Sequence, residues 1–152
     1  MAAEYLSNPI QEVALNAPIV FYDSIPCRRG NVYHEDGTGI FILRGNTCNQ
    51  CFATYQVTFN GNVALPEDAT DVVPIAVAIT VMGEQRPTSR AIYTPQETEE
   101  FGNLTSTAII KVPRGCCVSV SVDAVPATTD PTVTPAPIIE VQNANLVINR
   151  IA

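Results

Sequence analysis

Charged residues are scarce in this chain, and basic residues are the scarcest among them. Asp, Glu, Lys and Arg together make up 15% of the 152 residues, against about 25% in a typical globular domain. The chain has 8 basic and 15 acidic residues, which gives a net charge of −7. Lys111 is the only lysine, and only Arg28 and Arg29 are adjacent. Nucleic acids and anionic membranes are bound by clustered Lys and Arg, so the composition argues against both as partners.

Long apolar runs are missing too. No run approaches the roughly 18 apolar residues that a membrane-spanning helix needs. The start of the chain, Met1–Tyr5, lacks the basic region and apolar core of a signal peptide. We therefore expect a protein that is made in the cytoplasm of its producing cell without a signal peptide.

Residues suited to a catalytic centre are few. His34 is the only histidine, so a Ser–His or Cys–His arrangement has a single candidate base. It precedes a glycine turn, where we expect it to be solvated. The densest acidic cluster, Glu97, Glu99 and Glu100, lacks the spacing of a calcium loop and is expected to be a solvated loop. The chain also has no phosphate-binding glycine loop and no nucleophile elbow. We expect no enzyme, no catalytic residues, no cofactor and no metal site.

The cysteines do not describe a disulfide framework, because their number is odd and the chain carries no secretion signal. Small buried hydrophobic residues are the favoured interpretation, and disulfides formed after release from the cell are the alternative. Cys48 and Cys51 have the spacing of zinc ligands, but no second pair of that spacing follows. The sequence leaves open the redox state of Cys27, Cys48, Cys51, Cys116 and Cys117.

Apolar and polar residues alternate with a period of two, which predicts strands with one buried and one wetter face. In the run from Phe52, for example, Ala53, Tyr55, Val57 and Phe59 fall on one face. The predicted strands are Pro18–Tyr22, Asn31–His34, Ile40–Leu43, Phe52–Asn60, Pro74–Met82, Arg90–Thr94, Thr105–Val112, Cys117–Val125 and Ile139–Ile151.

Turn residues separate these strands. Asn60-Gly61 after Phe59 is a strong hairpin signal. Strand-like runs with a turn roughly every ten residues predict an all-β sandwich or barrel. We expect a head domain over residues 17–152, preceded by an N-terminal arm over residues 1–16. The Thr/Pro-rich segment Ala127–Pro137 is expected to be an exposed loop of the head, since a strand pattern resumes after it.

One predicted strand, Ile75–Met82, is apolar on both faces. In a sandwich the outer face of a sheet meets water unless a partner covers it. Self-association is the favoured explanation, and a covering loop of the same chain is the alternative. The expected interface residues lie on this strand and on the last one, namely Ala76, Ala78, Met82, Val147 and Ile151.

Three stretches then suggest a family. The succession Asn31–His34, Asp36–Leu43 and Phe52–Phe59 resembles the tumour-necrosis-factor-like jelly roll, also called the complement globular-head fold. The closing Val141–Ile148 resembles the last strand of that fold. The resemblance implies an antiparallel two-sheet jelly-roll sandwich that forms a non-enzymatic homotrimer, with its first and last strands close together.

Other stretches resemble short proteins encoded among the head genes of tailed bacteriophages and prophages. These stretches are Ala3–Ile10, Arg28–Tyr33 and Ile148–Ala152. The resemblance implies a structural virion protein that decorates the capsid surface as a trimer, stabilises the head and has the major capsid protein as a partner. The N-terminal arm would then dock the head onto the capsid, through Tyr5, Leu6, Ile10 and Val13.

The alternative function is a head that binds a glycan or a host-surface protein. Binding hot spots usually gather Trp, Tyr and Arg. The chain has no Trp, and Arg86, Arg90 and Tyr93 are the one loop grouping of this kind. This composition favours the structural role over the binding role.

Overall fold

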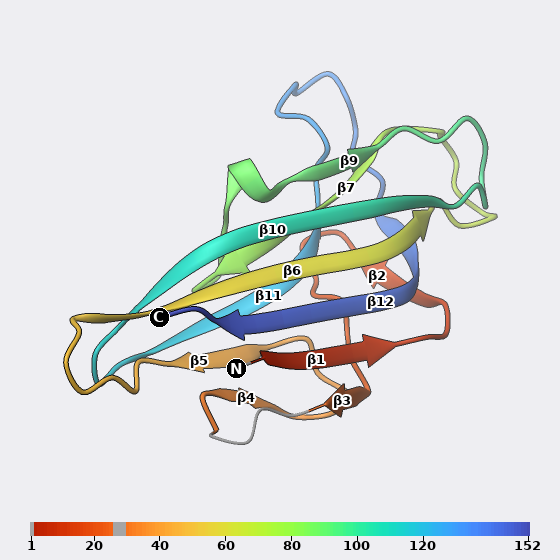
Figure 1. Cartoon of the computed structure of the whole chain (residues 1–152). Helices are drawn as coiled ribbons and strands as arrows, with labels where there is room; N and C mark the ends of the chain where they lie inside the picture. Colours follow the sequence, from red (N-terminus) through yellow and green to blue (C-terminus); the bar gives the residue numbers. More distant parts are fainter. Residues whose placement is uncertain (1, 26–29) are drawn as a thin grey trace.

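Two antiparallel β-sheets of six strands each make up the structure, a computed structural model that describes residues 2–25 and 30–152 (Figure 1). The first sheet has the order β10 (Gly102–Pro113), β6 (Phe52–Ala64), β12 (Ile138–Arg150), β1 (Ala2–Ser7) and β3 (Asp23–Ile25), with β2 (Gln11–Ala14) also paired to β12. The second has the order β4 (Val32–His34), β5 (Phe41–Arg44), β11 (Cys117–Val125), β7 (Ile75–Val81) and β8 (Glu84–Gln85), with β9 (Ala91–Tyr93) also paired to β7. One short 3₁₀ helix, η1, spans Pro87–Ser89.

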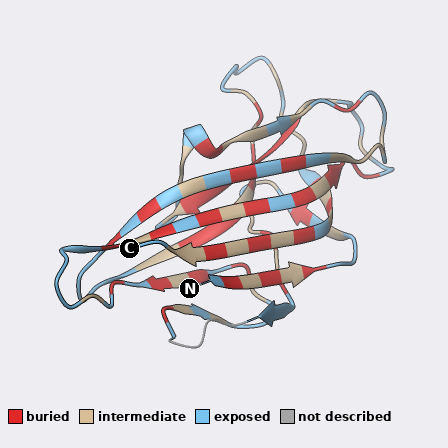
Figure 2. Ribbon diagram, viewed as in Figure 1, coloured by how far each residue is buried: buried red, intermediate tan, exposed pale blue. Residues whose placement is uncertain are grey.

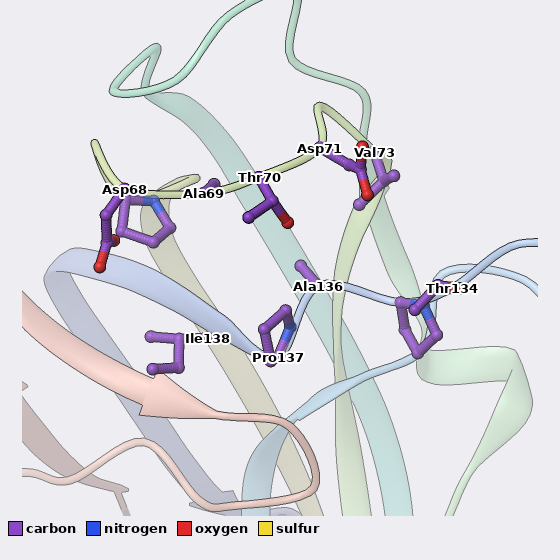
Figure 3. A pocket seen from close by; sticks show the side chains of 11 residues that line it. Asp68, Ala69, Thr70, Asp71, Val73, Thr134, Ala136, Pro137 and Ile138 are labelled. Carbon is purple, nitrogen blue, oxygen red and sulfur yellow. The ribbon is translucent and has the colours of Figure 1, made fainter.

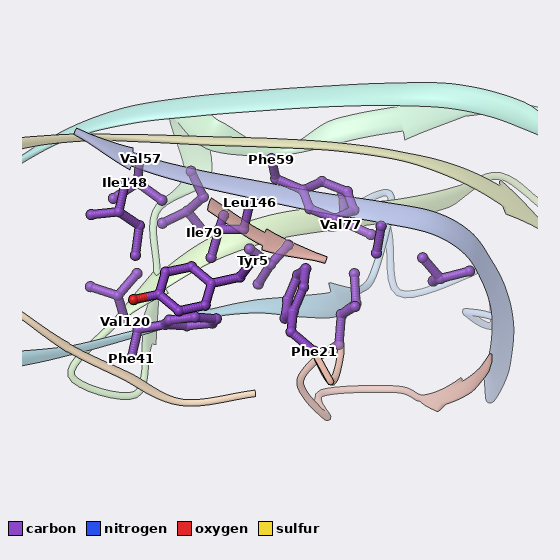
Figure 4. Packing of buried hydrophobic residues seen from close by; sticks show 14 of the residues in the cluster. Tyr5, Phe21, Phe41, Val57, Phe59, Val77, Ile79, Val120, Leu146 and Ile148 are labelled. Atoms are coloured by element: carbon purple, nitrogen blue, oxygen red, sulfur yellow. The ribbon is translucent and has the colours of Figure 1, made fainter. Parts of the chain in front are cut away.

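The alternation in the sequence becomes an alternation of burial along each long strand of the first sheet (Figure 2). In β6, Ala53, Tyr55, Val57 and Phe59 are fully buried, whereas the residues between them are exposed or half-buried. The inward side chains of the two sheets meet in one apolar core (Figure 4). The predicted all-β sandwich of two antiparallel sheets is confirmed.

An aromatic group occupies one part of this core. The rings of Tyr5 and Phe41 meet edge to face with their centroids 4.6 Å apart. Phe21 approaches Phe41 in the same way at 5.5 Å. The three rings come from β1, from the segment before β3 and from β5, so the core joins segments that lie far apart in the sequence (Figure 4).

The first and last strands are neighbours. β1 pairs antiparallel with β12 from Ala2↔Asn149 to Ser7↔Ala144, and the two ends of the chain lie close together (Figure 1). This is the arrangement that the resemblance to the jelly-roll family implies.

The N-terminal segment is part of the sandwich, and the expected boundary at residue 16 is wrong. β1 and β2 both pair with β12, and Tyr5 and Val13 are each 3% exposed in the core. Two of the four residues expected to dock onto a capsid are therefore unavailable for docking. Leu6 is half-buried, and Ile10 is 52% exposed.

The hairpin expected at Asn60-Gly61 does not form. β6 continues through these residues to Ala64 and pairs with β10, with Gly61 opposite Leu104. Gly61 lies on the inward face, where an added Cβ would come within 2.7 Å of Cζ of Phe59. The glycine therefore makes room for the Phe59 ring and does not bend the chain.

The apolar second face of β7 is covered by the same chain. Ala76 and Ala78 are 1% and 0% exposed and form a small cluster with Val125 and Ala127. Part of the cover comes from the start of the Thr/Pro-rich loop that leads from β11 to β12. The two alanines are thus not available as interface residues, and the alternative of a covering loop is the correct one.

Candidate functional site

His34 lies in the core and not in a solvated turn. Its side chain is 1% exposed, and its ring is stacked on Phe41 with centroids 4.2 Å apart. Nε2 lies 2.9 Å from the carbonyl oxygen of Thr38 and donates to it, while Nδ1 is 3.9 Å from Oδ1 of Asp36. The expectation of a solvated residue is wrong, and His34 has the environment of a structural histidine.

The four described cysteines are exposed, so the favoured interpretation of buried hydrophobic residues is wrong for them. Their loops adjoin at one end of the sandwich, where Gly45 N donates to the carbonyl of Cys116 and Arg114 N donates to that of Cys51, each at 2.9 Å. Among the described residues no three His, Cys, Asp or Glu side chains are grouped so that they could hold a metal ion. Cys27 lies outside the described residues. The four exposed thiols belong to Cys48, Cys51, Cys116 and Cys117.

The opposite end of the sandwich carries a small hollow of about 160 Å³ between two loops (Figure 3). Pro66 and Val73 come from the loop after β6, and Ala136 and Pro137 from the loop before β12. Asp68 and Asp71 also line it. The hollow is mostly apolar in its side chains, with acidic residues on one side.

Carboxylates crowd the surface beside this hollow. Glu140 on β12 is directly opposite Glu12 on β2. Partial burial raises the pKa of Glu140, and the charges of nearby acids raise it further, Glu99 and Glu12 most and then Asp68 and Glu67. Among the described residues no Lys or Arg lies within ion-pair distance of an Asp or Glu, so these acids repel one another without a compensating cation.

The residues expected at a subunit interface do not share a face. Val147 is half-buried and points outward from the first sheet, and Ile151, just beyond β12, is 50% exposed. Met82 is 64% exposed at the turn after β7 in the second sheet. With Ala76 and Ala78 buried, only Val147 and Ile151 are near each other.

The outer face of the first sheet has a broad area with almost no charge, which we call the central patch. The strand registers define it as three rows across β10, β6, β12 and β1, and all of its members are exposed or half-buried. The rows are Ile109, Gln56, Asn149 and Ala2; Thr107, Thr58, Val147 and Glu4; and Thr105, Asn60, Asn145 and Leu6.

Several polar side chains of the central patch form hydrogen bonds with one another. The hydroxyls of Thr58 and Thr107 are 3.0 Å apart across the strand pair, and the amide of Asn145 donates to the carboxylate of Glu4. Glu4 is the one ionisable residue of the patch. Cores of protein–protein interfaces are depleted of charged residues, so the patch is suited to contact with another protein. Of its members, sequence reasoning singled out only Val147, for self-association, and Leu6, for docking onto a capsid, because outward Thr, Asn and Gln in a strand are the ordinary pattern of a solvated face.

Comparison with known structures identifies the fold. The globular domain of zebrafish complement 1qA has a TM-score of 0.61 at 12% identity, covering 99% of this chain and 97% of that one. Eiger TNF from S. frugiperda has a TM-score of 0.66 at 12% identity, covering 100% and 92%. Murine APRIL has a TM-score of 0.52 at 10% identity, covering 97% and 98%. The chain therefore has the tumour-necrosis-factor-like jelly-roll fold of the complement globular heads.

The other comparisons found no relative. No protein-family model matches the sequence, and no curated protein matches it. In residues 2–25 and 30–152 the structure has no helix of the length and hydropathy that crossing a membrane would take.

Proposed function

We propose that this protein is a non-enzymatic structural head that forms a homotrimer through the central patch and decorates the surface of a bacteriophage capsid. The central patch is the observation that supports this most. A sheet face that stays in water usually carries charged residues, whereas the three rows of the central patch have Glu4 as their one ionisable residue. Contact with sister copies would explain this near absence of charge.

The distribution of charge supports the same proposal. The chain has 15 acidic residues and a net charge of −7, and five of these acids, Glu12, Glu67, Asp68, Glu99 and Glu140, gather at one end of the sandwich. Net negative charge keeps crowded copies from associating non-specifically. A patch with a single ionisable residue on an otherwise acidic molecule would confine association to one surface.

The proposed location on a capsid comes from the sequence. The stretches Ala3–Ile10, Arg28–Tyr33 and Ile148–Ala152 resemble proteins encoded among phage head genes. The partner would be the major capsid protein. Because the N-terminal segment belongs to the sheet, the surface that meets the capsid would be a loop end of the sandwich and not a free arm.

The direct test is made on particles. Phage particles released from the producing cells are purified on a density gradient and analysed by mass spectrometry, and particles lacking the gene are compared with the wild type under heat and low-salt shock. Capsid decoration predicts that the protein co-purifies with particles and that its loss makes them fragile. Purified wild-type particles that contain none of the protein would contradict the capsid role.

A second candidate is a binding head that recognises a surface glycan. The observation that favours it is a hollow on the second sheet, lined by hydroxyls and one carboxylate. Loss of the gene would then leave particles robust but poor at attaching to cells.

A further inference from the structure

A hollow of about 390 Å³ lies on the outer side of the second sheet. β11 contributes Ser119, Ser121 and Asp123, the side chains that point away from the core on that strand. Thr80 lies directly opposite Ser121 on β7. The segment that runs alongside β11 adds Asn16 and Pro18, and further lining residues are Ile40, Gly83 and Val120.

Asp123 is the one charged residue among those that line this hollow. The hydroxyl of Ser121 donates to its Oδ1 at 2.7 Å. Partial burial raises the pKa of Asp123, while the hydroxyls of Ser121 and Thr80 act in the opposite direction. The carboxylate is therefore partly shielded from water, and hydroxyl groups stabilise its charge where a cation could have done so.

Thr80 provides the second observation. The residue is 4% exposed, and its hydroxyl lies close enough to the carboxylate of Asp123 to lower the pKa of that group, but it has no other hydrogen-bond partner among the described residues. Its cross-strand neighbour Gln85 likewise has a buried amide nitrogen that is unpaired among the described residues. Buried polar groups without partners are rare in proteins and costly. A buried hydroxyl with incomplete hydrogen bonding at the edge of a hollow indicates a ligand that supplies the missing partner.

We propose that this hollow is a binding site for an uncharged saccharide. Sugar hydroxyls both donate and accept, so they can donate to the carboxylate of Asp123 and to the hydroxyl oxygen of Thr80. The carboxamide of Asn16 and the hydroxyl of Ser119 offer further partners of the same kind.

The residues that line the hollow favour an uncharged saccharide over an anion or a divalent cation. Asp123 repels anions, and no Lys or Arg lines the hollow to attract them. A single carboxylate is too few for a divalent cation, which takes six or more oxygen ligands, usually from several acids. Pro18 and Ile40 supply apolar surface, and Ile40 is 46% exposed. Such a wall suits the C–H face of a pyranose ring.

The saccharide site and the central patch are on different sheets, so their two functions do not compete. Ser121 and Asp123 belong to the second sheet, whereas the central patch lies on the outer face of the first. A trimer joined through the first sheet would leave the hollow open. The inference deepens the second candidate function and does not depend on the trimer or on the capsid.

The test is a titration of the ¹⁵N-labelled full chain with D-glucose, D-galactose, N-acetyl-D-glucosamine and L-rhamnose, followed by NMR. At least one sugar should shift the amide signals of Asn16, Thr80, Ser121 and Asp123, with saturation in the millimolar range. Chemical shifts that fail to change with any of the four, or that change only elsewhere, would overturn the proposal.

Two variants separate binding from folding. Thr80→Val keeps the shape of the side chain and removes the hydroxyl, so it should weaken binding about 2- to 10-fold without lowering the melting temperature. Asp123→Asn should weaken binding at least about tenfold, because hydrogen bonds to charged groups are the stronger ones. The matched controls Thr129→Val and Asp130→Asn alter exposed residues outside the hollow and should bind as the wild type does. Unchanged affinity in Thr80→Val and Asp123→Asn would refute the site even if a sugar binds.

Discussion

Glu12 and Glu140 face each other across paired strands, with Glu67, Asp68 and Glu99 nearby. Like charges directly opposite in a sheet destabilise it. The raised pKa of Glu140 means that folding favours its protonated form. The stability that this group contributes is present below its ordinary pKa and is lost as the pH rises through the raised value in the folded protein.

Glu140→Gln should therefore raise the melting temperature near neutral pH, because the neutral amide removes the repulsion. We expect a gain of less than about 1 kcal/mol, since exposed charges interact weakly. The difference from the wild type should shrink as the pH falls toward about 4.3, the ordinary pKa of glutamate. Melting curves between mildly acidic and neutral pH measure it.

Asp130 provides a control, because its pKa is shifted in the opposite direction to that of Glu140. The backbone N–H and hydroxyl of Thr132 both donate to its Oδ1 and lower its pKa. Asp130→Asn should thus lower stability at neutral pH, with a difference that disappears only when the carboxylate is protonated at low pH. A Glu140→Gln variant that is less stable than the wild type at neutral pH would contradict the account of the acidic cluster.

Gly61 is a second residue with a measurable role. Gly61→Ala places a methyl group within 2.7 Å of the fully buried Phe59 ring, which should cost about 1–3 kcal/mol, as overpacked cores do. Phe59→Leu shortens the side chain that the methyl would meet. A double-mutant cycle in denaturant should then show a smaller cost of Gly61→Ala in the Phe59→Leu background. Equal costs in both backgrounds would show that the contact does not matter.

Single residues also mark where sequence reasoning fails. The burial of His34 depends on Tyr5 and Phe41, two rings brought together by tertiary structure, and no local pattern indicates it. The hairpin signal of Asn60-Gly61 is overridden by pairing of β6 with β10 and by the need for space beside Phe59. In both cases long-range packing decides the outcome.

Among the elements, the long strands and the short strands β4, β5 and β9 could be predicted, whereas β1, β2, β3 and β8 could not. β6, β10, β11 and β12 carry a clear alternation over many residues, and all four were expected near their observed bounds. The short strands β1, β2 and β3 are paired at the side of β12 away from β6, and their small or polar residues give a weak signal. Pro18–Tyr22, expected as a strand, forms only isolated bridges, at Pro18 and Phe21.

The place of β1 in the sheet leads to a prediction about the N-terminal segment. Tyr5→Ala should lower the free energy of unfolding by about 3–5 kcal/mol, as removal of a buried aromatic ring does. Ile10→Ala should change it by less than about 0.5 kcal/mol, because the side chain is exposed. Urea denaturation measures both. Equal stability of the Tyr5→Ala variant and the wild type would restore the idea of a detachable arm.

At the scale of the whole molecule, the sandwich has two outer faces of different character. The first sheet presents the central patch with Glu4 alone among its ionisable residues. On the second sheet, Val125 and Ala127 cover the alanines of β7, and a polar hollow surrounds Asp123. The class of fold follows from the period of the sequence, but the face that meets a partner does not. The sequence pointed to Ala76 and Ala78, and the burial of both moves the expected contact to the other sheet.

The central claim is that sister copies cover the central patch, and sedimentation equilibrium at micromolar concentration tests it most directly. The wild type should have the mass of three copies of 16.3 kDa, about 49 kDa. Val147→Arg, which places a charge in the middle row of the patch, should sediment as a monomer, whereas Ile92→Arg, on an exposed residue of β9, should remain a trimer. A monomeric wild type, or a Val147→Arg variant that is still trimeric, would contradict the account.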